Sequence, residues 1–231
     1  MSIALVTCTS HRPLSFGFLL RSMMEQDYEG EVLWIIVEDG NNYSDAAYLL
    51  KAKGWDVQVI NLEDMGKEIS FSRNLAVALE KLEEQKNDIC KILFIEDDDY
   101  YKNNYISKMT KELDEYDAVG LSRVIYYHIR GYYAKLSNVF HSSLCSTGIR
   151  TYLLDKVKEA MKKEDVFVDL KLWEILRKEN FKIKMIDEPL CIGMKGWPGK
   201  HGIGRGHSIL WNYDLDSDYS KLSYVLNFKK G

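Results

Sequence analysis

Four consecutive carboxylates, from Glu96 to Asp99, are the most informative chemical feature of the sequence. They directly follow an apolar run at residues 89–95. Gathering four like charges is costly unless a cation neutralises them. Oxygen ligands suit a hard ion such as Mg²⁺ or Mn²⁺, which in turn binds phosphate oxygens. The run therefore predicts a metal site, and a solvated acidic turn is the alternative interpretation.

A second acidic pair, Glu38 and Asp39, ends another apolar run at residues 32–37 and is followed by Gly40. Ligands of open α/β sheets bind where the carboxyl ends of the strands meet. We therefore expect Asp39 to lie beside the first acidic run and to accept hydrogen bonds from a base or a ribose. An ordinary Asp-Gly turn is the alternative.

The elements around these motifs alternate between strand and helix patterns in the first half of the chain. Apolar strand-like runs at 3–7, 32–37, 57–62 and 89–95 are separated by helical patterns at 14–24, 43–53 and 70–84, the last with Ser70 as its expected cap. The second half predicts helices at 104–115, 151–162 and 170–178 and strands at 118–122, 124–127, 132–136, 146–150 and 181–186. This alternation predicts an α/β fold with a mainly parallel central sheet.

The composition is that of a globular chain with ample material for a core. Of the 231 residues, 46% are hydrophobic and 29% are charged, and the net charge of −4 argues against a broad basic surface for nucleic acid. The chain has no apolar stretch long enough for a transmembrane segment and no basic leader. Its four cysteines are widely spaced, so we expect a reducing, cytoplasmic location. We expect one domain over 1–231, with a nucleotide-binding half (1–100), an acceptor half (101–192) and a lid and tail (193–231).

Taken in order, four motifs resemble those of the GT-A fold nucleotide-sugar glycosyltransferases of the family 2 kind. The first strand and its loop at 4–13 read ALVTCTSHRP, like that family's Thr/Ser-x-Arg-Pro opening. Residues 37–40, VEDG, are similar to its (D/E)DG, and residues 71–76, FSRNLA, to its ARNxA. Residues 95–99, IEDDD, resemble its DxDD (DXD-type) metal motif, with Glu96 in place of the first aspartate. The resemblance covers roughly residues 3 to 192.

This resemblance implies a GT-A (Rossmann-like) fold and a set of site residues. Asp98 and Asp99 would bind Mn²⁺ or Mg²⁺, with Glu96 in support. A nucleoside-diphosphate sugar, with a UDP-sugar favoured, would be held by Thr7, Thr9, Arg12, Asp39, Arg73 and Asp97.

The base of an inverting transfer is expected near residue 169. Residues 166–176, VFVDLKLWEIL, resemble the family's EDxxLWxxL, which implies that Asp169 takes the proton of the acceptor hydroxyl. Val168 replaces the family's usual glutamate. Without the family, Asp169 opens an amphipathic helix and is equally well its N-cap. Glu164 and Asp165 are nearby rivals for the base.

The segment at 193–207 contains six glycines and several cations. Such a segment can form a lid over a diphosphate through its amides and through Lys195, Lys200 and Arg205. It is not a P-loop, because His201 stands where Ser or Thr is required. By resemblance, His201 or His207 completes the metal shell. A surface loop with incidental histidines is the alternative.

Together these features favour a metal-dependent, inverting glycosyltransferase that acts on a hydroxyl acceptor such as a glycan precursor. Two alternatives stay open. The first is a glycosyltransferase for hydroxymethylated pyrimidines in DNA, and the second is a nucleotidyltransferase or a non-catalytic nucleotide-sugar binding module. The tyrosines at 126, 127, 132 and 133 form either a stacking platform or ordinary strand positions. We expect Trp34 and Trp173 in the core, and His128 and His141 as packed or surface residues.

Overall fold

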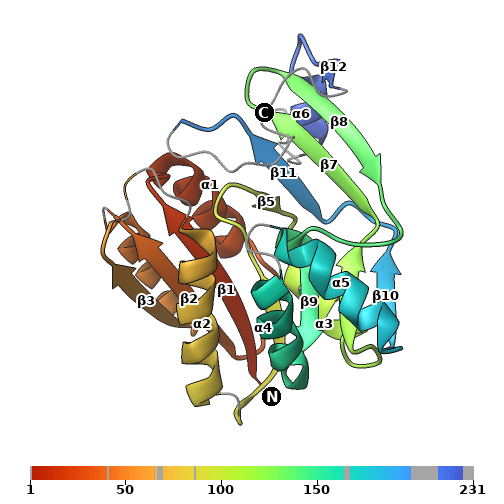
Figure 1. Cartoon of the computed structure of the whole chain (residues 1–231). Coiled ribbons are helices and arrows are strands. Elements are labelled where there is room, and N and C mark those ends of the chain that lie inside the picture. Colours follow the sequence, from red (N-terminus) through yellow and green to blue (C-terminus); the bar gives the residue numbers. More distant parts are fainter. Residues whose placement is uncertain are drawn as a thin grey trace.

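The structure, a computed structural model, describes residues 2–40, 42–64, 66, 70–85, 87–163, 167–198 and 213–225. It is an α/β arrangement in which a seven-stranded sheet carries helices on both faces and a five-stranded sheet lies at one end of it (Figure 1).

The seven-stranded sheet has the order β10-β6-β9-β4-β1-β2-β3. Only β9 runs antiparallel to its two neighbours, and the other described pairs are parallel. The mainly parallel sheet predicted from the sequence is therefore confirmed. Its strands are β1 (Ser2–Ser10), β2 (Val32–Asp39), β3 (Asp56–Leu62), β4 (Ile89–Phe94), β6 (Ala118–Leu121), β9 (Thr147–Arg150) and β10 (Ile183–Ile186).

Side-chain alternation along the central strands builds a core on each face of this sheet. Ile3 and Leu5 of β1 pack with α1 (Pro13–Met24), η1 (Tyr43–Lys53) and α3 (Tyr105–Glu112). Ala4 and Val6 pack with α2 (Phe71–Gln85), α4 (Leu154–Lys163) and α5 (Val168–Lys178), which lie on the same side of the sheet in Figure 1. Trp34 and Trp173 are buried in these two cores, as predicted.

Most predicted helices form close to their expected bounds, but the one expected at 43–53 is different. Residues Tyr43–Lys53 form a 3₁₀ helix, which ends at Gly54 with a φ of 79°. Glycine adopts this left-handed conformation without steric cost. The helix expected at 151–162 is preceded by a short 3₁₀ turn, η3 (Thr151–Leu153).

The five-stranded sheet has the order β12-β8-β7-β11-β5. Because β4 belongs to the first sheet and β5 follows at residue 100, the acidic run is the crossing between the two sheets. The strands are β5 (Tyr100–Tyr101), β7 (Arg123–His128), β8 (Tyr132–Ser137), β11 (Cys191–Lys195) and β12 (Asp214–Leu215).

The start of the glycine-rich segment is a strand rather than a loop. Gly193 to Lys195 belong to β11, which pairs with β7 on one side and with β5 on the other. The absence of a side chain explains Gly193, because a Cβ there would lie 2.4 Å from the ring of Tyr126. Glycine thus permits close packing at this position, where the sequence reading took it as a sign of backbone freedom.

The described part of the tail, residues 213–225, docks on the second sheet as expected. β12 pairs with β8, and α6 (Ser220–Val225) follows. The buried carboxylate of Asp216 accepts hydrogen bonds from the Tyr127 hydroxyl at 2.9 Å and from the backbone N–H of Lys221 at 3.1 Å. Across the described ranges, no helix is both long enough and apolar enough to cross a membrane.

Candidate functional site

The four acidic residues Glu96–Asp99, hereafter the carboxylate cluster, form the centre of the candidate site. Carboxylate oxygens of Glu96, Asp98 and Asp99 all lie within 4.8 Å of one another. Asp97, Asp98 and Asp99 are at most 4% exposed. A solvated acidic turn would leave these side chains in water, so their burial contradicts that alternative interpretation.

At one end of the cluster, both carboxylate oxygens of Asp97 are bound by residues at the end of β1 and just after it. Arg12 Nη1 lies 2.8 Å from Asp97 Oδ1 and 3.3 Å from Asp98 Oδ2. The Thr9 hydroxyl donates to Asp97 Oδ2 at 2.6 Å. Since that proton is used, Tyr43 donates its hydroxyl proton to Thr9 Oγ1 at 2.7 Å and accepts from the Arg12 backbone N–H at 2.9 Å.

At the other end, Asp99 is held by β11. Its Oδ1 accepts the backbone N–H of Met194 at 3.0 Å and lies 3.2 Å from Lys195 Nζ. Lys195 Nζ is also 3.8 Å from Asp98 Oδ2. The second oxygen, Asp99 Oδ2, is buried and accepts no hydrogen bond from an N–H or O–H group. Trp197 Nε1 covers this end by donating to the Asp98 carbonyl at 3.1 Å.

The charges of the cluster do not balance. Among the described ion pairs, two cations, Arg12 and Lys195, contact Asp97, Asp98 and Asp99. With Glu96 the ionised cluster has four negative charges, two more than these two described cations supply. Burial, followed by the charge of Asp99, raises the pKa of Glu96 to about 8. Burial likewise raises the pKa of Asp99 to about 6, although Lys195 opposes it. A deficit of two positive charges is the one that a single divalent cation would fill.

Asp39 lies at the same sheet edge, but β1 separates it from the cluster. Ser10 pairs in register with Asp39, and Thr9 with Glu38. Asp39 Oδ1 accepts hydrogen bonds from Ser70 Oγ and from Asn74 Nδ2, both at 2.9 Å. Ser70 also accepts the Asn74 backbone N–H at its carbonyl, so it stands at the start of α2 as expected. The start of α2 is thereby tied to the end of β2.

Asp169 is the second position of α5, whose N-cap is Phe167. The alternative prediction that Asp169 is the N-cap is therefore wrong, and its carboxylate lies within the first turn, where the helix dipole favours negative charge. Burial raises the pKa of Asp169, and hydrogen bonds from the helix backbone and the nearby His141 oppose the rise. The charge of Asp169 is also the smallest of the contributions named for the raised pKa of Glu96.

Two of the predicted nucleotide-binding residues are engaged elsewhere. Thr7 is fully buried, and its hydroxyl oxygen accepts the Trp34 indole N–H at 3.0 Å within the core. Arg73 donates from Nη2 to the Glu63 carbonyl at 2.7 Å, after the end of β3. Four further predicted residues, namely Lys200, His201, Arg205 and His207, lie outside the described residues, as do the rival bases Glu164 and Asp165.

The sequence reading assigned no role to three residues that complete the site. Tyr43 joins Thr9 to Arg12, Asn74 joins α2 to Asp39, and Trp197 covers Asp98. Asn74 could have been identified from the sequence, because it is part of the motif at residues 71–76. Tyr43 and Trp197 carry no local signal, since their partners are far away in the sequence.

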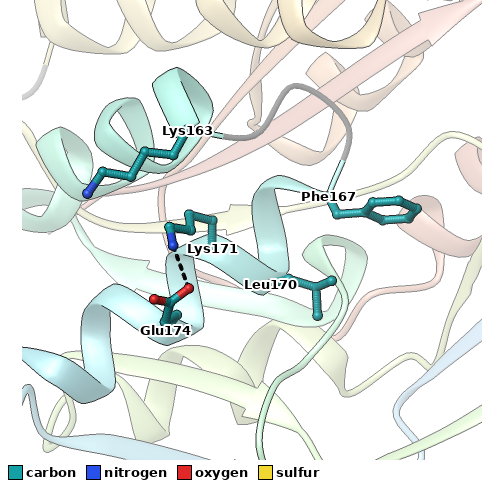
Figure 2. Close-up of a pocket in the computed structure, with 5 residues that line it drawn as sticks. All are labelled: Lys163, Phe167, Leu170, Lys171 and Glu174. Carbon is teal, nitrogen blue, oxygen red and sulfur yellow. Dashed lines mark hydrogen bonds and ion pairs between the residues drawn. The ribbon is translucent and has the colours of Figure 1, made fainter.

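A shallow pocket of about 450 Å³ lies on the outer face of α5 (Figure 2). It is lined by Phe167, Leu170, Lys171 and Glu174, which recur at helical spacing, and by Lys163 from α4. Lys171 Nζ donates to Glu174 at 2.6 Å across it. Asp169 projects from the opposite, buried side of the helix. The pocket is therefore separate from the carboxylate cluster.

Comparison with solved structures identifies the fold. The crystal structure of S. aureus TarS matches with a TM-score of 0.62 and 17% identity, over 84% of this chain and 37% of that chain. S. aureus TarS 1–349 in complex with UDP-GlcNAc matches with a TM-score of 0.58 and 17% identity, over 85% of this chain and 59% of that chain. The fold is thus a GT-A-like fold, as the motifs predicted.

The chain spans less than two thirds of the length of these TarS chains. No protein-family model matches the sequence, and no curated protein matches it.

Proposed function

We propose that the chain is a metal-dependent, inverting glycosyltransferase that moves a sugar from a nucleoside-diphosphate sugar to a hydroxyl acceptor. The observation that carries this proposal is the carboxylate cluster, which lies at the edge of a GT-A-like sheet and has two more negative charges than the two described cations that contact it supply. That edge is where α/β sheets bind their ligands.

The residues of the cluster fit a hard divalent cation. Glu96, Asp98 and Asp99 offer oxygen ligands only, within 4.8 Å of one another, and Mn²⁺ and Mg²⁺ prefer such ligands. These three residues would hold the ion. When bound, it supplies charge neutralisation for the departing diphosphate.

The donor would lie along the ends of β1 and β2. Asp39 would accept hydrogen bonds from the base, while Thr9 and Arg12 would border the nucleotide beside Asp97. The TarS structure in complex with UDP-GlcNAc supports a UDP-sugar as the donor. Lys195 would neutralise phosphate charge at the opposite end of the cluster. Thr7 would act indirectly, because its hydroxyl already binds Trp34. Arg73 would reach the nucleotide with the part of its guanidinium other than Nη2, which donates to the Glu63 carbonyl.

Asp169 would be the base that takes the proton of the acceptor hydroxyl. Burial raises the pKa of its carboxyl, and a carboxylate with a raised pKa is a stronger proton acceptor than an ordinary aspartate. The contribution of its charge to the raised pKa of Glu96 supports a position on the same side of the site as the carboxylate cluster. Attack by the acceptor on the face opposite the leaving group would then invert the anomeric centre.

Replacing the base provides the first test. Asp169→Asn should lower the rate of transfer by roughly 10²- to 10⁴-fold, which is the usual contribution of a general base, and should leave donor binding by thermal shift unchanged. Glu174→Gln is a matched control, because Glu174 is on the outer face of the same helix and pairs only with Lys171 among its described ion pairs. If Asp169→Asn transfers sugar at the wild-type rate, the base is a different residue.

Removal of the metal provides the second test. Excess EDTA should lower transfer roughly a hundredfold or more, because the diphosphate charge is then no longer neutralised, and Mn²⁺ should restore it. A thermal-shift panel of UDP-, GDP- and dTDP-sugars with Mn²⁺ would name the nucleotide, since a ligand stabilises the protein that binds it. Undiminished turnover in chelator would contradict the metal dependence.

The acceptor is proposed as a hydroxyl-bearing glycan, and the products separate the alternatives. Release of nucleoside diphosphate indicates glycosyl transfer, release of pyrophosphate indicates a nucleotidyltransferase, and donor affinity without release indicates a binding module. Salt-dependent binding of duplex DNA would favour hydroxymethylated pyrimidines as acceptors. We propose the cytoplasm as the location, because all four cysteines are free thiols.

A further inference from the structure

Two buried cysteines lie beside Asp99, one of the residues of the carboxylate cluster. Cys191 is the first residue of β11, and Cys145 lies in the 3₁₀ turn η2 (Leu144–Ser146). With Asp99 they form a group whose ligand atoms are all within 4.8 Å of one another. The three residues are at most 2% exposed. We call this group of Asp99, Cys145 and Cys191 the sulfur site.

Strand pairing and a turn position the three residues. Cys191 of β11 pairs in antiparallel register with Tyr101 of β5, and Asp99 directly precedes β5, so this strand pair brings Cys191 close to Asp99. The turn that carries Cys145 is held by the Tyr105 hydroxyl, which donates to the Cys145 carbonyl at 3.2 Å. The two thiols are in hydrogen-bond contact with each other. The donor atoms are therefore gathered before any ligand arrives.

Asp99 shows that this group lacks a positively charged partner on one side. Its Oδ1 is engaged by Met194 and Lys195, whereas Oδ2 is buried and accepts no hydrogen bond from an N–H or O–H group of the described residues. The Cys145 thiol is within hydrogen-bonding reach of the Asp99 carboxylate. One carboxylate oxygen of Asp99 lies within 4.8 Å of both sulfur atoms, and two sulfurs with one oxygen form a donor set that suits a soft divalent cation.

We propose that the sulfur site binds a thiophilic divalent cation such as Zn²⁺, Cd²⁺ or Co²⁺. Two sulfurs and one carboxylate oxygen select such ions, whereas the oxygen-only set of Glu96, Asp98 and Asp99 selects Mg²⁺ or Mn²⁺. Tetrahedral zinc with bonds of about 2.3 Å needs sulfurs about 3.8 Å apart. The 4.8 Å limit on the present separations therefore leaves less than about 1 Å of adjustment.

The charges also fit. A divalent cation with two thiolates and one carboxylate carries one net negative charge, and Lys195 Nζ, 3.2 Å from Asp99 Oδ1, balances it. Because Asp99 belongs to both groups, the soft cation and the hard cation compete for it.

The test is a titration of the reduced full-length chain with Co²⁺ alone, followed by absorption spectroscopy. We expect one equivalent to give the sulfur-to-cobalt charge-transfer band and the ligand-field bands of a tetrahedral site. Cys145→Ala and Cys191→Ala should each lose the charge-transfer intensity and weaken Co²⁺ binding by roughly 10- to 100-fold or more. Cys90→Ala is the matched control, because its thiol donates to the Ser2 carbonyl at the far end of β4.

A folded wild type without a sulfur-to-cobalt band, or a band that persists in both cysteine variants, would overturn the proposal. Where a variant does not fold, zinc X-ray absorption on the wild type decides: two sulfur neighbours support the site, and a shell of oxygen and nitrogen alone refutes it. In that second outcome the cysteines are simply small apolar core residues.

Competition between the soft and the hard cation for Asp99 can be measured as inhibition of sugar transfer, and this measurement rests on the proposed function. In the presence of Mn²⁺, added Zn²⁺ should inhibit transfer, and Cys145→Ala should raise the inhibitory Zn²⁺ concentration at least about tenfold. If no transfer is found at all, the proposed function fails while cobalt binding still stands. If transfer is found and Zn²⁺ has the same effect on wild type and variant, the competition at Asp99 fails.

Discussion

The two ends of the carboxylate cluster are built differently. Both oxygens of Asp97 have partners, one from Thr9 and one from Arg12. Asp99 is as deeply buried, yet only its Oδ1 has an N–H donor, and its Oδ2 has neither an N–H nor an O–H partner. At the Asp97 end both carboxylate oxygens have hydrogen-bond partners. At the Asp99 end one carboxylate oxygen has no N–H or O–H donor among the described residues.

This difference teaches which part of the cluster is structural and which part is poised for a ligand. Asp97 ties the crossing between the sheets to the loop after β1, so its partners hold the fold. Burial raises the pKa values of Glu96 and Asp99 to about 8 and about 6, and it also raises the pKa of Asp97, although Arg12 opposes that rise. Raised values of this kind are common at functional sites, where burial and like charges shift the pKa of carboxyl groups.

The largest expected effect comes from replacing the basic side chain at each end of the carboxylate cluster. Arg12→Met and Lys195→Met should each lower the free energy of unfolding by roughly 3–5 kcal/mol, since each leaves a buried carboxylate unpaired. Mn²⁺ should restore much of the loss in Lys195→Met and little of it in Arg12→Met, because the divalent cation is expected at the Asp99 end. Urea denaturation with and without Mn²⁺ measures both effects. Equal rescue of the two variants would erase the distinction between the ends.

The pH dependence of stability gives an intermediate effect. Glu96 and Asp99 have folded pKa values of about 8 and about 6, above their ordinary 4.5 and 3.8. The folded chain therefore binds more protons than the unfolded chain in this range, so stability falls as pH rises. The metal-free melting temperature should drop between about pH 4.5 and pH 8, through Asp99 up to about pH 6 and through Glu96 up to about pH 8, by about 2–4 °C for each kcal/mol.

Saturating Mn²⁺ should flatten this slope, because the cation favours the ionised carboxylates. Calorimetry at matched ionic strength, with EDTA in one series and Mn²⁺ in the other, makes the comparison. A metal-free protein that becomes more stable with rising pH across this range would show that the two carboxylates are already neutralised.

The smallest expected effect concerns the Asp97 end of the carboxylate cluster. Tyr43→Phe removes the hydroxyl that joins Thr9 to Arg12, and should cost about 1 kcal/mol, the usual net value of a hydrogen bond. The loss should be the same with and without Mn²⁺. Tyr48→Phe on the same 3₁₀ helix is the control, since Tyr48 is 39% exposed. A metal-dependent loss in Tyr43→Phe would mean that the Asp97 end also responds to the cation.

Much of the first sheet was predictable because its signals are local. The apolar runs of β1, β2 and β4 and the helical period of α2 lie within short windows, and alternation of strands with helices then predicts a parallel sheet. The acidic run and Asp39 could be placed at one sheet edge for the same reason. The interposed β1 and the 3₁₀ form of residues 43–53 were not foreseen, because neither strand order nor helix type is encoded by apolar spacing.

In the five-stranded sheet, local sequence patterns did not predict the surroundings of individual residues. The four tyrosines at 126, 127, 132 and 133 were indistinguishable by type, but strand alternation separates them. Tyr127 faces inward and binds Asp216, whereas the ring of Tyr126 lies beneath Lys195 Nζ, 5.5 Å from its centroid. The sequence reading assigned Lys195 to a loop, and its place in β11 follows from pairing with strands far away in the chain.

The sequence by itself determined the α/β class, the edge of the sheet at which chemistry would occur, and the acidic residues that would do it. Those features depend on residue type and on spacing over a few turns of chain. Only the tertiary structure decided which basic side chain contacts which carboxylate, and that two cysteines lie beside Asp99. Contacts across such distances in the chain carry no local pattern, because they are set by how separate elements pack.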